Sequence, residues 1–289
     1  MDLTIIIVNH NSKDLLINCL KSIKNGLKIN LLKHEIIVVD NASIDSSQEY
    51  LKKDRKIVVI VNKTNKGFGS ACNQGIAKAK GKYILLLNPD SLVLKDAIYK
   101  LVSFFKKFNK GFVGAKLLNP NLTVQASCGL FPNLPVVIMM LFLQGEKLNI
   151  TKFSPRKIVE VDWVSGACLL GKKEDFLKLG GFDENIFLYM EEVDLLYRAK
   201  KIGLLSYFYN EAEFIHIGAA VSGRKRAVNN IFQGLLYFYK KHYSSFDYSI
   251  LRFLLYLKSI IAISLGILIL KKHLILQYKF AIRNINKID

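Results

Sequence analysis

The stretch TIIIVNHNS, Thr4–Ser12, joins a run of β-branched residues to a polar tail, and similar strand-plus-tail stretches return three times downstream. Continuous apolar runs of this kind are typical of strands buried on both faces of a parallel sheet. The four strands are expected at Leu3–Val8, Glu35–Val39, Ile57–Val61 and Tyr83–Leu87. Helical patterns separate them, so the first third of the chain predicts an open, doubly wound α/β sheet.

Local signals place the helices between these strands. Ser12 is a candidate N-cap for the first helix. Ser46 followed by Glu49 resembles a capping box at the start of the second helix. The third helix is predicted at Ser70–Lys80, with Gly81 as the residue just beyond its end.

The rest of the chain is less regular. We expect, in order, a helix at Asp96–Lys107, a strand at Phe112–Leu117, a strand-like segment at Val161–Gly171, a helix at Lys173–Leu179 closed by Gly180-Gly181, and a helix from Glu191 to Lys201. We predict a main domain over residues 1–240 that divides into two halves, 1–95 and 96–240. A basic, hydrophobic helical extension over 241–289 is expected to follow.

Composition narrows the class of protein. The 289 residues include 42 Lys and Arg against 23 Asp and Glu, a net charge of +19, yet 51% are hydrophobic. A chain this apolar is not disordered. Basic and apolar character together favour an anionic lipid surface over nucleic acid as the partner. The four cysteines are widely spaced, which disfavours a disulfide framework or a zinc site.

The apolar run FLLYLKSIIAISLGILIL, Phe253–Leu270, contains Lys258 as its only charge. It reaches the lower length limit of a membrane-spanning helix. Three interpretations compete: a helix lying in the membrane interface, a buried or partner-packing helix, and a true span. We favour the interfacial helix. The N-terminus does not resemble a signal peptide, because Asp2 stands where positive charge is required and the apolar run is short.

Polar residues follow each of the four predicted strands. They begin at Asn9, Asp40, Asn62 and Asn88. In a doubly wound sheet, ligands bind beyond the carboxyl ends of the strands. Asp40 suits a base N–H or a ribose hydroxyl, and Asp90 suits a divalent cation that bridges a diphosphate. Polar turns alone are the simpler explanation for any one of these segments. The missing G-x-G-x-x-G and Walker A patterns disfavour a nicotinamide dehydrogenase and ATP hydrolysis.

Five segments carry a resemblance to a known family. They are TIIIVNHNS (Thr4–Ser12), VVDNASIDSS (Val38–Ser47), NKGFGSACNQG (Asn65–Gly75), LLLNPD (Leu85–Asp90) and VDWVSGACLLGKKEDFLKLGGFDENIFLYMEEVDLLYRAKKIG (Val161–Gly203). In this order they resemble family 2 glycosyltransferases of the GT-A fold, above all the bacterial rhamnosyltransferase-like subgroup. The resemblance extends over about Leu3–Ser222. It implies a Rossmann-like nucleotide-binding half with a mixed sheet, joined to an acceptor half.

The resemblance also implies roles for residues. Asp40 matches the aspartate that recognises the base, and Asp90 is the last residue of a metal-binding D-x-D, here written Asn88-Pro89-Asp90. His216 matches a late histidine that completes the metal site or touches the diphosphate, although a lone histidine is more often structural. The implied cofactor is a divalent metal, Mg²⁺ or Mn²⁺. The implied nucleotide-sugar site consists of Val8, Asn9, Asp40, Lys66, Gly67, Asn73 and Asn88.

The candidate catalytic base lies in the pair Glu191-Glu192. The family places the base second in an E-D pair, which makes Glu192 the candidate, with Glu191 and Asp194 as alternatives. The simpler explanation is charge compensation at a helix N-terminus, with Asp194 paired to Arg198. Trp163 and Gly166 are candidates for the sugar pocket, although a core role for Trp163 is nearly as plausible.

A basic cluster, Arg224, Lys225 and Arg226, suits a diphosphate or a lipid phosphate, with a solvated charge run as the simpler explanation.

The expected function is inverting, metal-dependent and non-processive transfer of one sugar, with rhamnose favoured. The implied partners are a nucleoside diphosphate sugar (dTDP-rhamnose favoured), a lipid-linked glycan acceptor and an anionic membrane surface, with no nucleic acid. The expected location is the cytoplasmic face of the bacterial inner membrane, peripheral or monotopic. Two alternatives remain: a catalytically silent membrane-associated scaffold, and a nucleotide-sugar enzyme of other chemistry such as a nucleotidyltransferase.

Overall fold

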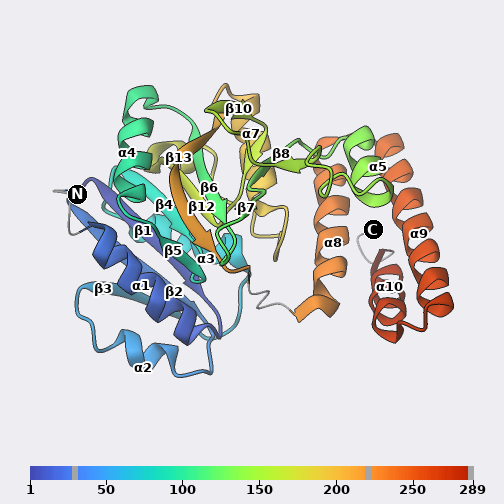
Figure 1. Cartoon of the computed structure of the whole chain (residues 1–289), viewed down its shortest axis with the longest axis horizontal. Coiled ribbons are helices and arrows are strands. Elements are labelled where there is room, and N and C mark those ends of the chain that lie inside the picture. The colour runs from blue at the N-terminus through green and yellow to red at the C-terminus, as the bar shows by residue number, and fades with distance from the viewer. Residues whose placement is uncertain (28–31, 219–222, 286–289) are drawn as a thin grey trace.

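The computed structural model describes residues 1–27, 32–218 and 223–285 (Figure 1). Its first third alternates strands and helices as the sequence predicts. In chain order these elements are β1 (Leu3–Asn9), α1 (Lys13–Leu27), β2 (His34–Asn41), α2 (Ser47–Leu51), β3 (Ile57–Asn62), α3 (Phe68–Lys78) and β4 (Tyr83–Leu87). The four strands are parallel, in the order β3-β2-β1-β4, and the register pairs Asn9 with Asp40.

The second part of the chain completes the sheet and adds a small one. Its elements are β5 (Ser91–Val93), α4 (Ala97–Phe108), β6 (Phe112–Leu118), β7 (Val124–Gln125), β8 (Cys128–Gly129), α5 (Leu134–Phe142), β9 (Lys152–Phe153), β10 (Val159–Val161), β11 (Trp163–Val164), β12 (Cys168–Lys172), α6 (Lys173–Lys178), α7 (Glu191–Lys201) and β13 (Ser206–His216). β12 runs antiparallel between β4 and β6, which makes the sheet mixed. β11, β8 and β9 form the separate three-stranded sheet.

Two hydrophobic clusters cover the two faces of the large sheet. Alternate residues of β1 serve different clusters: Ile5 and Ile7 pack in one, Ile6 and Val8 in the other. All four side chains are buried, because helices lie on both faces. This packing explains why the strands are apolar without alternation.

Three helices end the described chain: α8 (Gly223–His242), α9 (Ser245–Leu268) and α10 (Lys272–Ile285). They lie together with α5 on the side of the molecule away from α1 and α2 (Figure 1). α8 also packs against the main core, where Leu235 and Phe238 are fully buried. The predicted boundary at 240/241 falls in the last turn of α8, and the division into domains stays a prediction.

Three local predictions were wrong. Ser46 does not cap α2, because its backbone is left-handed (φ 61°) and its side chain makes no cap hydrogen bond. Instead, the Asp45 carboxylate accepts the Ser47 backbone N–H at 3.1 Å. The third helix ends at Lys78, so Gly81 is not the residue that follows its end. Gly81 instead allows a close approach to β1, because a Cβ at this position would overlap the backbone of Thr4.

The third error concerns the segment predicted as one strand at Val161–Gly171. It is broken into β10, β11 and β12, which join different partners: β10 pairs with β13, β11 with β8, and β12 with β4 and β6.

Candidate active site

The polar residues that follow the parallel strands meet at one edge of the sheet. Asn9 ends β1, and Asp40 lies beside it near the end of β2; both are fully buried. The Asp40 carboxylate accepts hydrogen bonds from Asn9 Nδ2 at 3.0 Å, the Ser43 backbone N–H at 3.0 Å and Gln48 Nε2 at 2.8 Å. Asp40 Oδ2 therefore keeps one lone pair, and Asn9 Oδ1 has no partner among the described residues. Two adjacent buried acceptors suit an N–H donor of a ligand.

Asn41 holds the loop after β3 in place. Its amide donates to Asn65 Oδ1 at 2.8 Å and to the Gly67 carbonyl at 3.1 Å, and its Oδ1 accepts the Lys66 backbone N–H at 3.0 Å. Lys66 is exposed, and Gly67, the N-cap residue just before α3, has a positive φ of 85°. The sequence placed Lys66 and Gly67 in the site but gave Asn41 no role in positioning them.

Gly67 cannot accept a side chain without strain. A Cβ at Gly67 would overlap the carbonyl oxygen of Phe187. We expect Gly67→Ala to lower the free energy of unfolding by about 3 kcal/mol, from the left-handed backbone plus overpacking. Gly180→Ala is the matched control, since Gly180 also has a positive φ (72°) but no atom within 4 Å of its Cβ position. The control should lose only about 1 kcal/mol. Urea unfolding measures both, and equal losses would contradict the overlap.

Asn73 and Val8 serve the structure around this edge. Asn73 Nδ2 donates to the Phe182 carbonyl at 2.9 Å, and its Oδ1 accepts the Phe182 N–H at 2.8 Å. Asn73 thus joins α3 to the segment before α7. Val8 is buried in the sheet core. Direct contact of either residue with a nucleotide stays a prediction.

Asp90 and His216 converge next to Asn88. His216 Nε2 lies 3.4 Å from Asp90 Oδ1 and 3.3 Å from Asn88 Nδ2. The Gln125 amide donates to the His216 carbonyl and to Asn119 Oδ1, so its own oxygen faces His216 Nδ1 at 2.8 Å. His216 Nδ1 therefore carries the proton, and the lone pair of Nε2 is directed to the side where Asp90 lies.

These two side chains fit a divalent cation as a partial ligand set. A carboxylate oxygen and an imidazole lone pair are ordinary ligands of Mn²⁺, and Mg²⁺ commonly uses one carboxylate plus substrate phosphates. No cluster of three or more His, Cys, Asp or Glu side chains that suits a metal occurs within the described residues. Phosphate oxygens of a donor would have to complete the coordination. The sequence did not anticipate Gln125, which is separated from His216 by 91 positions.

Glu191 and Glu192 begin α7, after two residues with left-handed backbone, Tyr189 and Met190. Glu191 is buried, and its Oε2 has no partner among the described residues. Burial raises the pKa of Glu191 well above its usual value, and the neighbouring Glu192 raises it further. Burial also raises the pKa of Glu192, which is only half-buried. Glu191 therefore holds its proton first, and Glu192 is the accessible carboxylate.

Gly166 connects Glu192 to the rest of the candidate site. Its backbone N–H points to Glu192 Oε1 at 3.4 Å, and a Cβ on Gly166 would lie 3.4 Å from the ring of Phe68. The next residue, Ala167, accepts the Asn88 backbone N–H at 3.1 Å. One short segment thus brings the start of α3, the Asn88–Asp90 segment and Glu192 together. The structure places Gly166 beside these residues, and its contact with a sugar stays a prediction.

Trp163 lies on the small sheet. Its Nε1 donates to the Leu130 carbonyl at 2.9 Å, and its ring covers Gly129. Contact of Trp163 with a sugar stays a prediction. The side chains of Arg224, Lys225 and Arg226 lie outside the part of the chain that the structure describes.

Asp194 has a structural role. It is fully buried and bound by Arg198 Nε at 2.8 Å, Lys241 Nζ at 2.8 Å and His242 Nε2 at 2.7 Å. The predicted pairing with Arg198 is confirmed. Lys241 also binds Asp183 at 2.6 Å, so α8 holds both α7 and the segment before it.

These partners give a pH prediction. Although burial opposes ionisation, hydrogen bonds from His242 and Lys241 hold the pKa of Asp194 at about 2. A lowered pKa contributes stability above the ordinary aspartate pKa, and this contribution is lost as the pH falls towards 2. We expect a loss of about 2 kcal/mol between about pH 5 and pH 2. Urea unfolding at several pH values measures it. Asp194→Asn should show a flatter dependence; an identical slope would contradict the assignment.

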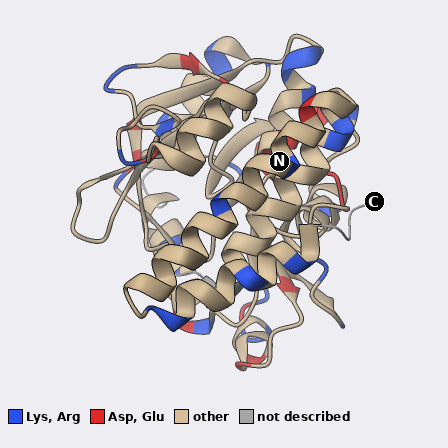
Figure 2. Cartoon of the chain, turned by 90° about the vertical axis from the view of Figure 1, so that its right-hand side faces the viewer, with Lys and Arg blue, Asp and Glu red and all other residues tan. Residues whose placement is uncertain are grey.

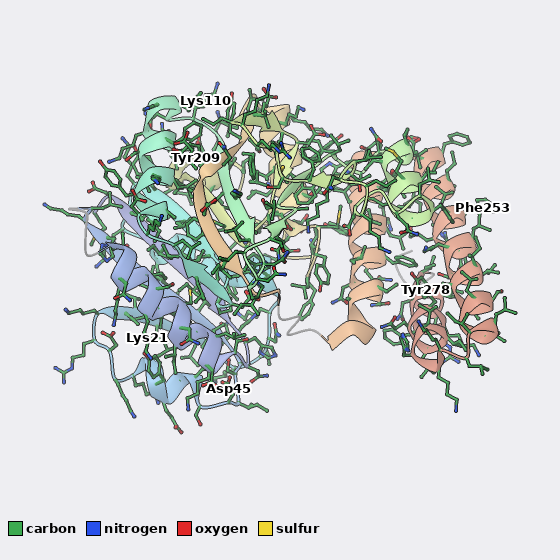
Figure 3. All side chains as sticks on the ribbon, in the orientation of Figure 1. Lys21, Asp45, Lys110, Tyr209, Phe253 and Tyr278 are labelled. Carbon is green, nitrogen blue, oxygen red and sulfur yellow. The ribbon has the colours of Figure 1, made fainter. Side chains whose placement is uncertain are left out.

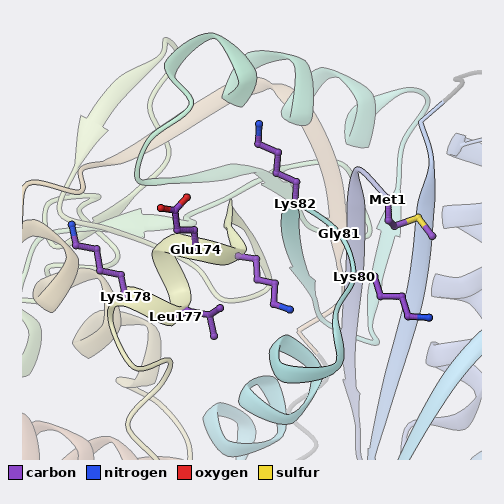
Figure 4. A pocket seen from close by; sticks show the side chains of 8 residues that line it. Met1, Lys80, Gly81, Lys82, Glu174, Leu177 and Lys178 are labelled. Atoms are coloured by element: carbon purple, nitrogen blue, oxygen red, sulfur yellow. The ribbon is translucent and has the colours of Figure 1, made fainter.

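A cavity of about 800 Å³ lies at the opposite edge of the sheet (Figure 4). It is lined by Met1, Lys80, Gly81, Lys82, Lys173, Glu174, Leu177 and Lys178. Met1 and Lys82 precede the amino ends of β1 and β4, whereas Asn9 and Asn88 lie at the carboxyl ends. This cavity is therefore separate from the candidate site.

The mixed, mostly parallel sheet with its flanking helices resembles the fold of GT-A glycosyltransferases. Residues 4–124 match the family described as glycosyl transferase family 2. The structure is similar to a crystal structure of GalNAc-T7 with UDP, GalNAc and Mn²⁺ (TM-score 0.60, 19% identity, 83% of this chain and 50% of that chain). At this identity the likeness concerns the fold.

Two curated relatives are similar in sequence. One is the low-salt glycan biosynthesis hexosyltransferase Agl10 of Haloferax volcanii, 28% identical over 215 residues (69% of this chain). The match spans 62% of that relative's length. The other is the N-acetylglucosaminyl-diphospho-decaprenol L-rhamnosyltransferase of Mycobacterium tuberculosis, 28% identical over 219 residues (66% of this chain and 69% of the relative).

Proposed function

We propose that the protein transfers a single sugar, with inversion at the anomeric carbon, from a nucleoside diphosphate sugar to a hydroxyl of a lipid-linked or growing cell-surface glycan. The observation that carries this proposal is Glu192. It is a half-buried carboxylate with a raised pKa, and it lies beside Gly166, next to both the start of α3 and the Asn88–Asp90 segment. A pKa raised towards neutrality is what a general base requires.

In the proposed reaction, the acceptor oxygen attacks the anomeric carbon from the face opposite the diphosphate. Glu192 takes the hydroxyl proton as the new C–O bond forms. The bond from the anomeric carbon to the diphosphate oxygen breaks, and its electron pair leaves with the nucleoside diphosphate. Asp40 and Asn9 provide the acceptors for a base N–H of the donor.

Asp90 and His216 are the residues that would hold a divalent metal, Mg²⁺ or Mn²⁺. Such an ion, when bound, offsets the negative charge that develops on the leaving diphosphate. The Asn88 amide contacts His216 and keeps the imidazole in place, while Gln125 fixes its protonated nitrogen.

For the donor we favour dTDP-rhamnose, and for the acceptor a lipid-linked glycan. The support is the resemblance to the Mycobacterium tuberculosis relative, which is named a rhamnosyltransferase acting on a diphospho-decaprenol lipid.

We further propose that the protein works at the cytoplasmic face of the inner membrane, held there by its C-terminal helices. α9 is long and apolar enough to cross a membrane by length and composition, and 28% of its most apolar window is buried. Figure 2 shows this side of the molecule largely tan, with blue basic segments.

Thermal shift with a panel of nucleoside diphosphate sugars, each with and without Mn²⁺, tests the donor proposal. A ligand that binds only the folded protein raises its melting temperature by mass action. We expect dTDP-rhamnose with Mn²⁺ to give the largest shift, and Asp90→Ala to remove the metal-dependent part. Selective stabilisation by another donor would overturn rhamnose, and no response to any donor would favour the silent scaffold.

Turnover separates the remaining alternatives. Metal-dependent donor hydrolysis that Glu192→Gln abolishes would exclude a silent scaffold. Pyrophosphate release from a nucleoside triphosphate would instead support a nucleotidyltransferase.

A further inference from the structure

α5 is apolar on every side but only partly covered. Its nine residues read LPVVIMMLF, and only Val136 and Val137 are buried. Ile138 is 40% exposed, and Leu143, which follows the helix, is 57% exposed. A helix that is hydrophobic all round normally lies inside a core or a membrane. Part of α5, at Pro135 and Ile138, therefore lacks the apolar surroundings that its sequence requires.

The outer face of α9 also carries apolar residues that no other part of the described chain covers. Its buried face is built mainly from small or medium residues: Leu251, Leu255, Ser259, Ala262 and Gly266. Its exposed face carries larger apolar residues at helical spacing: Phe253, Leu257, Ile260, Ile261 and Leu265. Phe253 points outwards from the edge of the molecule (Figure 3). Small residues inside and large apolar residues outside are typical of helices that face lipid.

Gly266 shows why the inner face of α9 is small. A Cβ at Gly266 would lie 2.9 Å from the Ile275 side chain of α10. α10 thus covers the inner face closely and leaves the outer face uncovered.

α5 and α9 are adjacent. α5 packs on α9, and Lys258 Nζ of α9 lies 5.9 Å from the centre of the Phe142 ring at the end of α5. We use the name α5–α9 surface for the exposed apolar residues Ile138, Leu143, Phe253, Leu257, Ile260 and Leu265.

The charges in the segments that carry this surface are mostly positive. Residues 134–148 and 245–285 contain two carboxylates, Glu146 and Asp247, against seven basic residues: Lys147, Arg252, Lys258, Lys271, Lys272, Lys279 and Arg283. Lys258 is half-buried, and no carboxylate lies within 4 Å of its ammonium among the described residues. A long cationic side chain in apolar surroundings extends so that its charged group lies at the polar boundary, where it can bind an anion. A phosphate of an anionic lipid meets this need.

We propose that the α5–α9 surface docks on an anionic bilayer, with α5 entering the interface beside α9 and Lys258 binding a lipid phosphate. This inference rests on the membrane location in the proposed function and adds a second contacting element. α5 belongs to the catalytic part of the chain: the Phe131 N–H just before it donates to Asp162 at 2.9 Å, next to Trp163. Docking through α5 therefore places the acceptor half close to the lipid, where a lipid-linked acceptor is found.

An interfacial arrangement fits the packing better than a span. The middle of α9, at Lys258, contacts α5. If α9 crossed the bilayer, α5 and the loop that joins it to the small sheet would be carried towards the bilayer centre. Irregular backbone exposed to lipid is not tolerated there.

Vesicle flotation of the full-length protein tests the proposal. We expect binding to vesicles containing phosphatidylglycerol and weak binding to pure phosphatidylcholine. Leu143→Asp should lower the bound fraction at least fivefold. Leu177→Asp is the matched control, because Leu177 on α6 has the same 57% exposure but lies outside this surface, and it should bind like wild type. Lys258→Met should reduce the preference for anionic vesicles, and Lys258→Arg should restore it.

A second variant keeps the test independent of folding. Leu143→Cys labelled with an environment-sensitive fluorophore should show a blue-shifted spectrum on adding anionic vesicles, since the four native cysteines are buried. No shift would overturn the role of α5.

The outcomes separate the two levels of the proposal. If Phe253→Asp abolishes flotation but Leu143→Asp does not, α5 is not a contact and the membrane location stands. If wild type does not float, both fail. A stable dimer by light scattering that Leu143→Asp dissociates, without change in flotation, would assign the surface to a second copy and overturn the docking.

Discussion

Replacing Glu192 with Gln is expected to lower kcat for sugar transfer by about 10³-fold, which is the range a general base contributes. The amide keeps the shape of the carboxylate but cannot accept the acceptor proton. Donor affinity should change little. Glu192 contacts the Gly166 backbone and does not contact Asn9 or Asp40, the residues proposed to bind the base of the donor. Steady-state kinetics together with donor titration measure the two quantities separately.

Glu191→Gln is the matched control. Burial and the adjacent Glu192 raise the pKa of Glu191 well above its usual value and so favour the neutral acid, which a glutamine mimics closely. We therefore expect only a few-fold loss in kcat. A larger loss in Glu191→Gln than in Glu192→Gln would reverse the assignment of the base.

Asp90→Asn is expected to cause the second-largest effect, a fall in kcat/KM of about 10²- to 10³-fold through lost stabilisation of the leaving diphosphate. The substitution removes the charge and keeps the size of the side chain. Wild-type activity should disappear with EDTA and return with Mn²⁺, whereas the residual activity of the variant should respond weakly to both. Asp96→Asn, at a half-exposed carboxylate that pairs with Lys100, should behave like wild type. Full metal-dependent activity in Asp90→Asn would contradict the role of Asp90.

The sheet and its edge could be predicted from the sequence because their signals are local. β4 spans Tyr83–Leu87 and α7 spans Glu191–Lys201, both at the predicted bounds. Parallel strands then bring Asn9 and Asp40 together, since their carboxyl ends share one edge.

The errors arose where distant parts of the chain decide the local structure. Gly81 looked like a helix end but is required by the close approach of Thr4. Ser46 does not cap α2. The Asp45 carboxylate accepts the Ser47 N–H instead, and it also accepts the Lys13 N–H of α1.

The residues that position the site could not be predicted either, because they act through contacts between distant parts of the chain. Gln125 orients His216 across 91 positions, and Lys241 joins Asp183 to Asp194 from α8. Such single contacts leave no periodic signal in a sequence. Gln48 is a partial exception, since a polar residue in the first turn after the Asp40 loop is a reasonable partner for that carboxylate.

The central claim is that this protein transfers a sugar with Glu192 as the base. The most direct test incubates the purified protein with dTDP-rhamnose, Mn²⁺ and a lipid-linked N-acetylglucosamine diphosphate acceptor, and weighs the lipid product by mass spectrometry. We predict a product heavier by one deoxyhexose with wild type and Glu191→Gln, and about 10³-fold slower formation of this product with Glu192→Gln. Equal product from Glu192→Gln, or no sugar transferred from any nucleotide sugar that the protein binds, would contradict the account.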